Sequence, residues 1–351
     1  MKRRSGLLKS ILVLILLAAL TAAGGLFLTF RHKNIMTQNG AVSYLLVPQG
    51  ADFEQLMDSL AGNGYLKIEK TFRWAAEHEN LPANVHPGRY AVSPDMNNQQ
   101  LARKLAMGWQ DPLNVTISGS IRTFERLAAV LTRNLEIDSA GMLSHIRNDS
   151  LITAMGFDSV SLRAMFIPNT YEVYWTISEA ELLKRMYKEY NQFWNDTRKE
   201  KARLLGMTPL QVSTLASIVY EETKKTDEMP AVAGVYINRL RINMPLQADP
   251  TLIFAAGDYS IRRVLRKHTR IDSPYNTYKN RGLPPGPISV PSIEAIDAVL
   301  NYQDHDYLYF CAKEDFSGYH NFAPNLREHM KNARKFQRAL TERLRQEGQG
   351  K

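Results

Sequence analysis

The sequence predicts an α+β protein, mainly helical, that follows a single membrane-spanning segment. Three observations carry this prediction. Residues 11–30 contain no charged residue, and a β-α-α-β pattern follows over residues 43–108. Apolar residues at helical spacing then dominate residues 109–345, where strand-like runs are short. This order predicts a tail over residues 1–10 and a connector over residues 31–42.

The apolar segment 11–30 has the length of a membrane-spanning helix. Its 20 residues, at ~1.5 Å rise each, match a hydrocarbon core of ~30 Å. A cleaved signal peptide is the competing interpretation, because TAAGG resembles a small-residue cleavage site. The apolar run continues through Phe30 and favours an uncleaved anchor in the cytoplasmic (inner) membrane. The basic residues that flank it are Lys2, Arg3, Arg4 and Lys9 before the segment, and Arg31 and Lys33 after it. Their bias predicts a cytoplasmic N-terminus, with the folded part on the periplasmic side.

Charge and cysteine content exclude some classes of protein. The net charge of +9 is spread along the chain and suits a neighbourhood of anionic lipid or anionic polymer. The sequence contains no basic run with interleaved aromatic residues, which is the pattern typical of nucleic-acid binding. Cys311 is the sole cysteine, so the chain has no internal disulfide. Its apolar surroundings predict a core residue rather than a catalytic thiol.

Residues 43–108 have the pattern of a small module. SYLLV at 43–47 predicts a strand, and Asp52 predicts the N-cap of a helix with apolar residues at i, i+3, i+4 and i+7. A second helix follows, and RYAV at 89–92 predicts the second strand. The order resembles a LysM-type sugar-binding module. The alternative is an α+β subdomain that binds nothing itself.

Helical patterns dominate residues 122–241 and are interrupted at 166–175 by the aromatic run FIPNTYEVYW. A segment rich in proline and glycine, SPYNTYKNRGLPPGPISVPS, follows at 273–292. Ordered irregular segments of this length are usually functional. The chain then continues with an expected helix at 292–301, a strand at 306–312 and a basic helix at 324–346.

The helix expected over residues 208–225 carries a carboxylate on its apolar stripe. Thr208 predicts its N-cap. Leu215, Ile218 and Val219 lie at i, i+3 and i+4, and position i+7 is Glu222. Glu221 is displaced by about 100° around the helix, so Glu222 rather than Glu221 is expected to point inward. Burial raises the pKa of a carboxyl group, as a general acid needs near neutral pH. The alternative is a helix-end glutamate that reaches solvent or pairs with a nearby lysine.

Four strings occur in an order that resembles one known family. They are ASIVYEET, VYINRLRINMPLQADPT, YNTYKNRGLPPGPI and YHNFAPNLREH. In these strings the chain resembles the endolytic murein transglycosylases, the YceG-like family. The resemblance implies a mainly helical α+β catalytic domain over residues 109–345. The resemblance implies that Glu222, which precedes Thr223, is the catalytic acid and base.

Two positions depart from the family pattern. Tyr220 stands where family members often have a glutamate, which argues that the earlier glutamate is not required. Asn169, in FIPNTY, stands where they often have aspartate. That change removes a candidate second carboxylate and weakens a two-carboxylate mechanism built on this segment.

The resemblance implies cleavage of the β-1,4 bond between N-acetylmuramic acid and N-acetylglucosamine inside glycan strands of peptidoglycan. Glu222 would protonate the glycosidic oxygen, then take the proton of the muramic 6-hydroxyl, which closes a 1,6-anhydro ring. No metal or organic cofactor is implied. The implied setting is cell-wall remodelling and termination of glycan elongation, beside cell-wall synthases.

Several further residues are predicted to hold the sugar, because they offer amides, hydroxyls or aromatic faces. Asp249, before Pro250, is expected to be an N-cap. The predicted substrate-binding residues are Gln247, Thr251, Tyr275, Asn276, Thr277, Tyr278, His320, Asn169 and Tyr171.

Two other functions stay open on the sequence. The first is a muramidase-type hydrolase, which normally needs two carboxylates. The second is a membrane-anchored peptidoglycan-binding protein without activity. The chemical form of the product end separates the lyase from the hydrolase, and Glu222 argues against the inactive binder.

Overall fold

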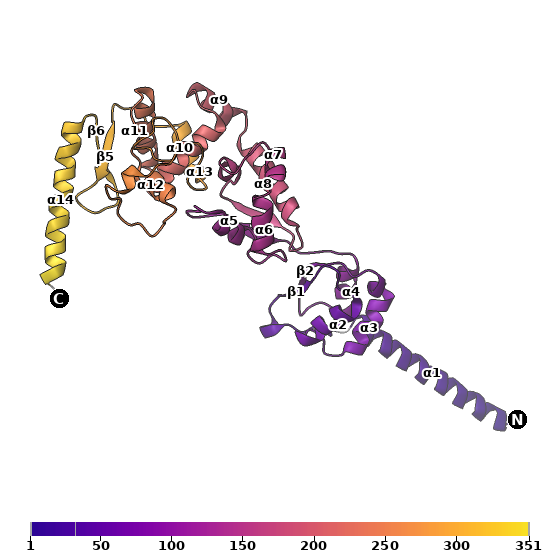
Figure 1. The fold of residues 1–351 in the computed structure, drawn as a ribbon. Coiled ribbons are helices and arrows are strands. Elements are labelled where there is room, and N and C mark those ends of the chain that lie inside the picture. The colour runs from indigo at the N-terminus through magenta and orange to yellow at the C-terminus, as the bar shows by residue number, and fades with distance from the viewer. Residues whose placement is uncertain (1, 32, 350–351) are drawn as a thin grey trace. The chain divides into compact units, whose positions relative to one another are not determined.

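The computed structural model describes residues 2–31 and 33–349 and divides into two compact units. The first unit contains the chain up to Asn114, together with Asn134–Ile137 and Glu172–Ile177. The second contains Val115–Arg133, Asp138–Tyr171 and the chain from Ser178 onward. Three two-stranded sheets lie among many helices (Figure 1), which confirms the predicted mainly helical α+β class.

The chain begins with the long helix α1 (Lys2–Phe30), and its segment Ser10–Phe30 is long and apolar enough to cross a membrane. Large side chains such as Leu12 and Leu14 are exposed, because no protein packs around this part of the helix. A signal sequence passes the same test of length and composition. Whether α1 is kept in the mature protein, and which way it crosses the membrane, therefore stay predictions.

The first unit has the predicted β-α-α-β order. Strand β1 (Ser43–Val47) pairs antiparallel with β2 (Gly88–Val92), with Ser43 opposite Val92. Asp52 caps α2 through a reciprocal capping box with Gln55. Leu45, Leu60, Phe72 and Tyr90 are buried in its core. The remaining elements are η1 (Gln38–Gly40), α2 (Phe53–Gly62), α3 (Glu69–His78), η2 (Leu81–Ala83) and α4 (Asn98–Ala106).

Short helices fill the middle of the chain. The aromatic run at 166–175 contains strand β4 (Thr170–Val173), which pairs with β3 (Leu113–Thr116). Each longer helix here begins at a residue whose side-chain oxygen accepts a backbone N–H, as Ser178 does for α8. The helices are α5 (Phe124–Leu131), α6 (Ser139–Ile146), α7 (Asp149–Ala154), η3 (Leu162–Met165), α8 (Glu179–Phe193) and α9 (Asp196–Leu204).

Helix α10 (Pro209–Glu222) forms the centre of the second unit. The predicted capping box between Thr208 and Gln211 is present. The predicted single apolar stripe is wrong, because every residue from Val212 to Val219 is buried. A polar group on a helix enclosed on all sides needs a partner within the protein. The Ser217 hydroxyl donates to the Thr214 carbonyl and accepts the N–H of Ile288, whereas the buried Ser213 hydroxyl has no partner among the described residues.

Two helices pack against α10, namely α11 (Met229–Arg241) and α13 (Ile293–Leu300). The proline- and glycine-rich segment between them is irregular and tightly packed. A Cβ atom on Gly286 would lie 2.4 Å from the Val160 carbonyl oxygen, so only glycine permits this approach. The remaining elements are α12 (Asp249–Ala256), η4 (His268–Arg270), β5 (Tyr309–Ala312), β6 (His320–Ala323) and α14 (Leu326–Gln349).

Candidate active site

Glu222 is the last residue of α10 and lines a cavity of about 360 Å³. The walls come from α11, the loop between α11 and α12, the start of α12, the loop between η4 and α13, strand β5 and the first turns of α14. The cavity therefore collects residues that are up to about a hundred positions apart in sequence. The lining residues are Glu222, Tyr236, Arg239, Leu246, Gln247, Asp249, Tyr278, Tyr309, Phe310, Leu326, His329 and Met330.

The Glu222 carboxyl is desolvated. Burial raises its pKa to about 7, and the negative charge of Asp249 acts in the same direction. The Tyr236 hydroxyl donates a hydrogen bond of 2.8 Å to Oε1 of Glu222 and moderates the increase. Tyr236 is itself 1% exposed, so this bond has a fixed geometry. A carboxyl group that is close to half protonated at neutral pH can both donate and accept a proton.

Arg239 places a cation in the same cavity, and only 7% of the residue is exposed. Its guanidinium donates to the carbonyls of Leu308, Pro245 and Leu246, the last at 2.7 Å. Those bonds use three of the five N–H donors of an arginine. Among the described residues, no acceptor bonds Nη2, which leaves two donors for a ligand in the cavity.

Asp249 is the second carboxylate of the cavity. The N-cap of α12 is Ala248, so the predicted capping role of Asp249 is wrong. The Tyr278 hydroxyl instead donates to Oδ1 of Asp249 at 2.5 Å. Gln247, beside it, has a left-handed backbone with φ of +50°. Residues other than glycine and asparagine rarely adopt this conformation, which marks a position held by its surroundings.

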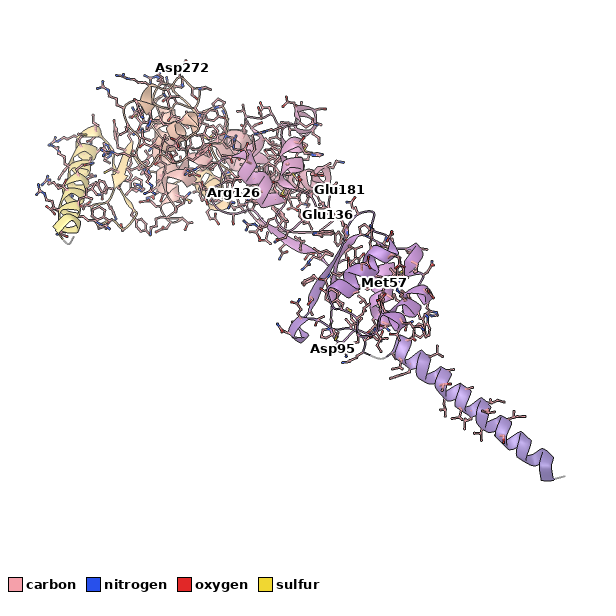
Figure 2. The ribbon with its side chains drawn as sticks, turned by 60° about the horizontal axis from the view of Figure 1, so that its bottom comes forward. Met57, Asp95, Arg126, Glu136, Glu181 and Asp272 are labelled. Atoms are coloured by element: carbon pink, nitrogen blue, oxygen red, sulfur yellow. The ribbon has the colours of Figure 1, made fainter. Side chains whose placement is uncertain are left out.

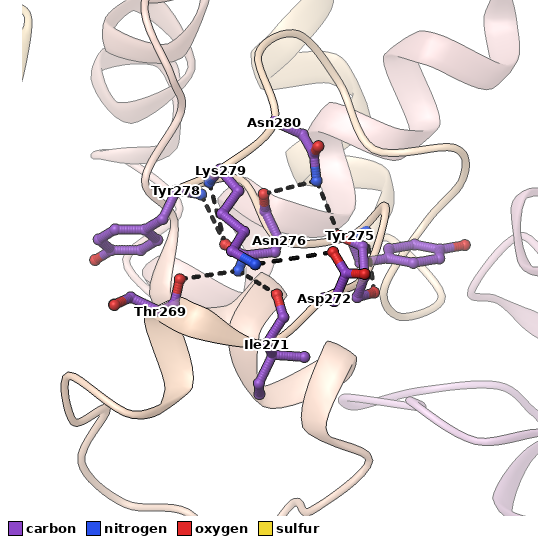
Figure 3. Close-up of polar contacts among 9 residues, drawn as sticks. Thr269, Ile271, Asp272, Tyr275, Asn276, Tyr278, Lys279 and Asn280 are labelled. Atoms are coloured by element: carbon purple, nitrogen blue, oxygen red, sulfur yellow. Dashed lines mark hydrogen bonds and ion pairs between the residues drawn. The ribbon is translucent and has the colours of Figure 1, made fainter.

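Three of the predicted sugar-binding residues lie behind the cavity wall. The hydroxyls of Thr251 and Thr277 are 2.8 Å apart, and Thr277 also accepts the backbone N–H of Ala248. Asn276 is fully buried, and its amide donates to the carbonyls of Thr269 and Ile271, as Figure 3 shows. Its Oδ1 accepts the backbone N–H of Tyr278. These groups fix two loops, the one after η4 that carries Tyr278 and the one before α12 that carries Gln247, whose N–H donates to the Thr277 carbonyl.

The other predicted residues lie outside the cavity lining. Tyr275 packs against Phe254, with ring centroids 4.6 Å apart and ring planes tilted by 51°. The Tyr171 hydroxyl donates to the Ile167 carbonyl, and the residue is buried. Asn169 is exposed, and its Oδ1 accepts the N–H of the following residue. His320 pairs with Glu228 through Nδ1 at 2.8 Å, although its charge still acts on Glu222.

Sequence reasoning missed Tyr236, Arg239, Tyr309, His329 and Met330. A signal existed for the first two, because they lie at i and i+3 on α11 and so share one face of that helix. Strand β5 and helix α14 supply the other three, and no local pattern brings these elements to α10. In residues 2–31 and 33–349, no three His, Cys, Asp or Glu side chains form a group that could hold a metal ion.

The expected orientation of Glu221 is wrong. Its side chain is 1% exposed, and Oε2 accepts Nη2 and Nε of Arg122 at 2.5 and 3.1 Å. The Ser120 hydroxyl donates to Oε1. Burial alone would raise the pKa of this carboxyl, but the bonds from Arg122 and Ser120 hold it below its usual value. The pKa values of adjacent glutamates on α10 are thus shifted in opposite directions.

A desolvated carboxyl with a raised pKa, a phenol that donates to it and an arginine with free donors make this cavity a candidate acid–base site. The model of the YceG-like family matches residues 45–335, and the chain belongs to this family.

Relatives support the assignment at moderate identity. The chain is 29% identical over 308 residues to an endolytic murein transglycosylase of Bacillus subtilis, covering 83% of each protein. It is 27% identical over 321 residues to one of Streptococcus pneumoniae D39, covering 82% of this chain and 57% of that protein. A yceG-like protein of Listeria monocytogenes, solved at 2.6 Å, superposes with a TM-score of 0.53 and 25% identity, over 84% of this chain and 99% of that one.

Replacement of Glu222 by glutamine should change how stability depends on pH. Below the ordinary carboxyl pKa of 4.5, Glu222 is protonated in both the folded and the unfolded chain. Between that pH and about 7 the unfolded chain ionises while the folded chain keeps the proton, so the wild type loses stability as pH rises. The Glu222→Gln variant lacks this loss. Its advantage should grow through this window and level off above it in pH-dependent denaturation.

Asp158 supplies the control of opposite sign. The Ser161 hydroxyl and N–H lower the pKa of Asp158, so its contribution is present at neutral pH and lost on acidification. Asp158→Asn should therefore be most destabilising at neutral pH. An advantage of Glu222→Gln that did not depend on pH would contradict the buried, protonated carboxyl.

Glu221→Gln should cost stability, because it leaves Arg122 without its carboxylate beside a side chain that is itself only 1% exposed. We expect a loss of about 1–3 kcal/mol in free energy of unfolding, below the value for a fully buried pair because Arg122 is 34% exposed. Glu189→Gln is the matched control. It breaks the i,i+4 pair with Arg185 on α8, where both side chains are more exposed, and should cost about 0.5 kcal/mol or less. Equal losses in chemical denaturation would refute the buried pair.

Proposed function

We propose that this protein is an endolytic lytic transglycosylase of peptidoglycan. The observation that carries the proposal is the Glu222 carboxyl, whose pKa of about 7 and place in an open cavity suit a group that donates and then accepts one proton. The names of the Bacillus and Streptococcus relatives support the same reaction class.

The reaction begins with transfer of the Glu222 proton to the oxygen of the bond between N-acetylmuramic acid and N-acetylglucosamine. The bond from the muramic C1 to that oxygen breaks, and C1 becomes an oxocarbenium-like centre. The carboxylate left on Glu222 is stabilised by the Tyr236 hydrogen bond. It takes the proton of the muramic 6-hydroxyl, and that oxygen attacks C1. The new end is a 1,6-anhydro ring, no water is consumed, and Glu222 regains its proton.

The cavity also offers groups that can orient the sugars. The Nη2 donors of Arg239 suit a carbonyl or carboxylate oxygen of the muramic substituents. Gln247 supplies an amide, and Tyr278 and Tyr309 supply aromatic faces. Thr251, Asn276 and Thr277 act indirectly, because their polar groups are used within the protein.

A muramidase-type hydrolase is the second candidate, and Asp249 favours it. A retaining or inverting hydrolase needs a second carboxylate near the acid, and Asp249 lines the cavity with Glu222. The hydrogen bond from Tyr278 occupies one oxygen of Asp249, so that oxygen is less available to a water molecule or to the muramic C1. This bond leads us to prefer the lyase.

The product end provides the test. The full-length protein in detergent should cut peptidoglycan strands internally and leave new 1,6-anhydromuramic ends. Borohydride cannot reduce these ends, and mass spectrometry after borohydride treatment identifies them. Glu222→Gln should lower the rate by roughly 10²–10⁴, because the transferable proton is gone.

The hydrolase gives the contrary outcome. If the new ends are all reducible, water captured the cation, and Asp249→Asn should then abolish turnover. Near-normal turnover by Glu222→Gln would remove the acid role from this residue under either reaction.

We further propose that α1 anchors the mature protein in the cytoplasmic membrane, with the N-terminus inside. Its 21-residue apolar segment Ser10–Phe30 supports this. The protein would then cut strands near the membrane, where synthases elongate them, and the LysM-like module would hold the strand.

Fractionation should recover the intact chain in membranes, with protease access from outside only. A soluble mature form that begins near residue 24 would show a cleaved signal peptide instead.

A further inference from the structure

The C-terminal helix α14 carries a stripe of basic side chains, which we call the basic stripe: Arg327, Lys331, Arg334 and Arg338. Their spacing of four, three and four residues places them on one face of the helix. All four are exposed. Figure 2 shows nitrogen-tipped side chains projecting from the outer side of this helix, away from the rest of the second unit.

The charge of the basic stripe is not balanced within the protein. Helix α14 contains seven basic and three acidic residues. Among the described residues, no ion pair forms to Arg327, Lys331 or Arg338, and Arg334 donates only to the Met330 carbonyl. Like charges at i and i+4 repel each other and destabilise a helix. The arrangement therefore gains from an anionic partner outside the chain.

The basic stripe adjoins the candidate active site. Leu326, His329 and Met330, from the first turns of the same helix, line the Glu222 cavity. The helix is held in place because His329 stacks on Tyr309 of β5, with centroids 5.2 Å apart. Phe336 packs on Phe316 further along, at 5.8 Å. A peptide stem that extends from a glycan in the cavity past the first turns of α14 would thus reach the row of cations on the outer side of the helix.

We propose that the basic stripe binds the carboxylates of the peptide stems on the strand that occupies the cavity, so that the substrate is peptide-bearing rather than stripped glycan. This inference rests on the proposed function. The stems project from successive muramic residues and end in free carboxylates. Guanidinium groups match carboxylates in geometry and stay charged. Each exposed pair is weak, but stems on one strand engage together and their effects multiply.

An anionic membrane surface is the other partner with suitable charge. A helix that lies on a membrane inserts a continuous apolar face. On α14, Phe336 is packed on Phe316, and the exposed Leu326 and Met330 line the Glu222 cavity. The continuity of the basic stripe with the cavity favours the substrate, and the membrane becomes an outcome of the test.

The experiment compares two substrates and two variants of the full-length protein in detergent. The first variant is Arg327→Gln with Lys331→Gln and Arg338→Gln. The matched control, Lys184→Gln with Lys188→Gln and Lys199→Gln, removes the same charge from exposed positions on α8 and α9. The substrates are uncrosslinked glycan strands with peptide stems and the same strands stripped by an amidase.

The stripe variant should lose roughly tenfold in kcat/KM on peptide-bearing strands, mostly through KM, as expected for the loss of three exposed ion pairs. It should match the wild type on stripped strands, and its deficit should shrink at high salt. The control variant should match the wild type on both substrates.

Equal kcat/KM of wild type and stripe variant on peptide-bearing strands would overturn the inference. So would a deficit of the same size on stripped strands. If the stripe variant loses only binding to vesicles of anionic lipid, the partner is the membrane and the inference is also overturned. Failure of the wild type to cut either substrate would instead contradict the proposed function.

Discussion

The burial of one carboxyl group at the end of a buried helix is the constraint on which the second unit depends. Helix α10 is enclosed from Val212 to Val219, so its last residue, Glu222, is held where water is scarce. A charged carboxylate is costly there, and the proton is retained up to about neutral pH. The Tyr236 hydrogen bond offsets part of this cost. The packing of α10 on α11 therefore determines both the position and the acidity of the candidate catalytic group.

The neighbouring glutamates on α10 show that surroundings, rather than residue type, decide charge state. Glu221 is as deeply enclosed as a core residue but has Arg122 and Ser120 as partners, and its pKa is lowered. Among the residues that the structure describes, the one hydrogen-bond donor to the Glu222 carboxyl is the Tyr236 phenol, and the pKa of Glu222 is raised. The ion pair of Glu221 also ties the end of α10 to the segment before α5, which limits movement of Glu222. Glu221 thus carries a fixed negative charge, and Glu222, the next residue, carries a transferable proton.

The loop between α12 and α13 serves chiefly as a support. Asn276 bonds Thr269 and Ile271, while Thr277 bonds the N–H of Ala248. These contacts hold Tyr278 against Asp249 at the cavity wall. Sequence reasoning assigned the whole polar group to the sugar, since composition cannot distinguish an amide that faces a ligand from one that faces the backbone. The side chains of Asn276 and Thr277 thus have their hydrogen-bond partners within the protein.

The sequence alone determined the fold class, the family resemblance and the choice of Glu222. These follow from local information, namely the apolar N-terminal run, the strand and helix spacings, and four strings in order. Only the tertiary structure decided that Tyr236, Arg239, Asp249 and His329 share a cavity with Glu222, and that Glu221 is buried in an ion pair. Periodicity reports one face of one helix. It carries no information about which distant elements enclose the other faces, and it is those elements that supply the hydrogen-bond donors, the charges and the exclusion of water on which the chemistry of a carboxyl group depends.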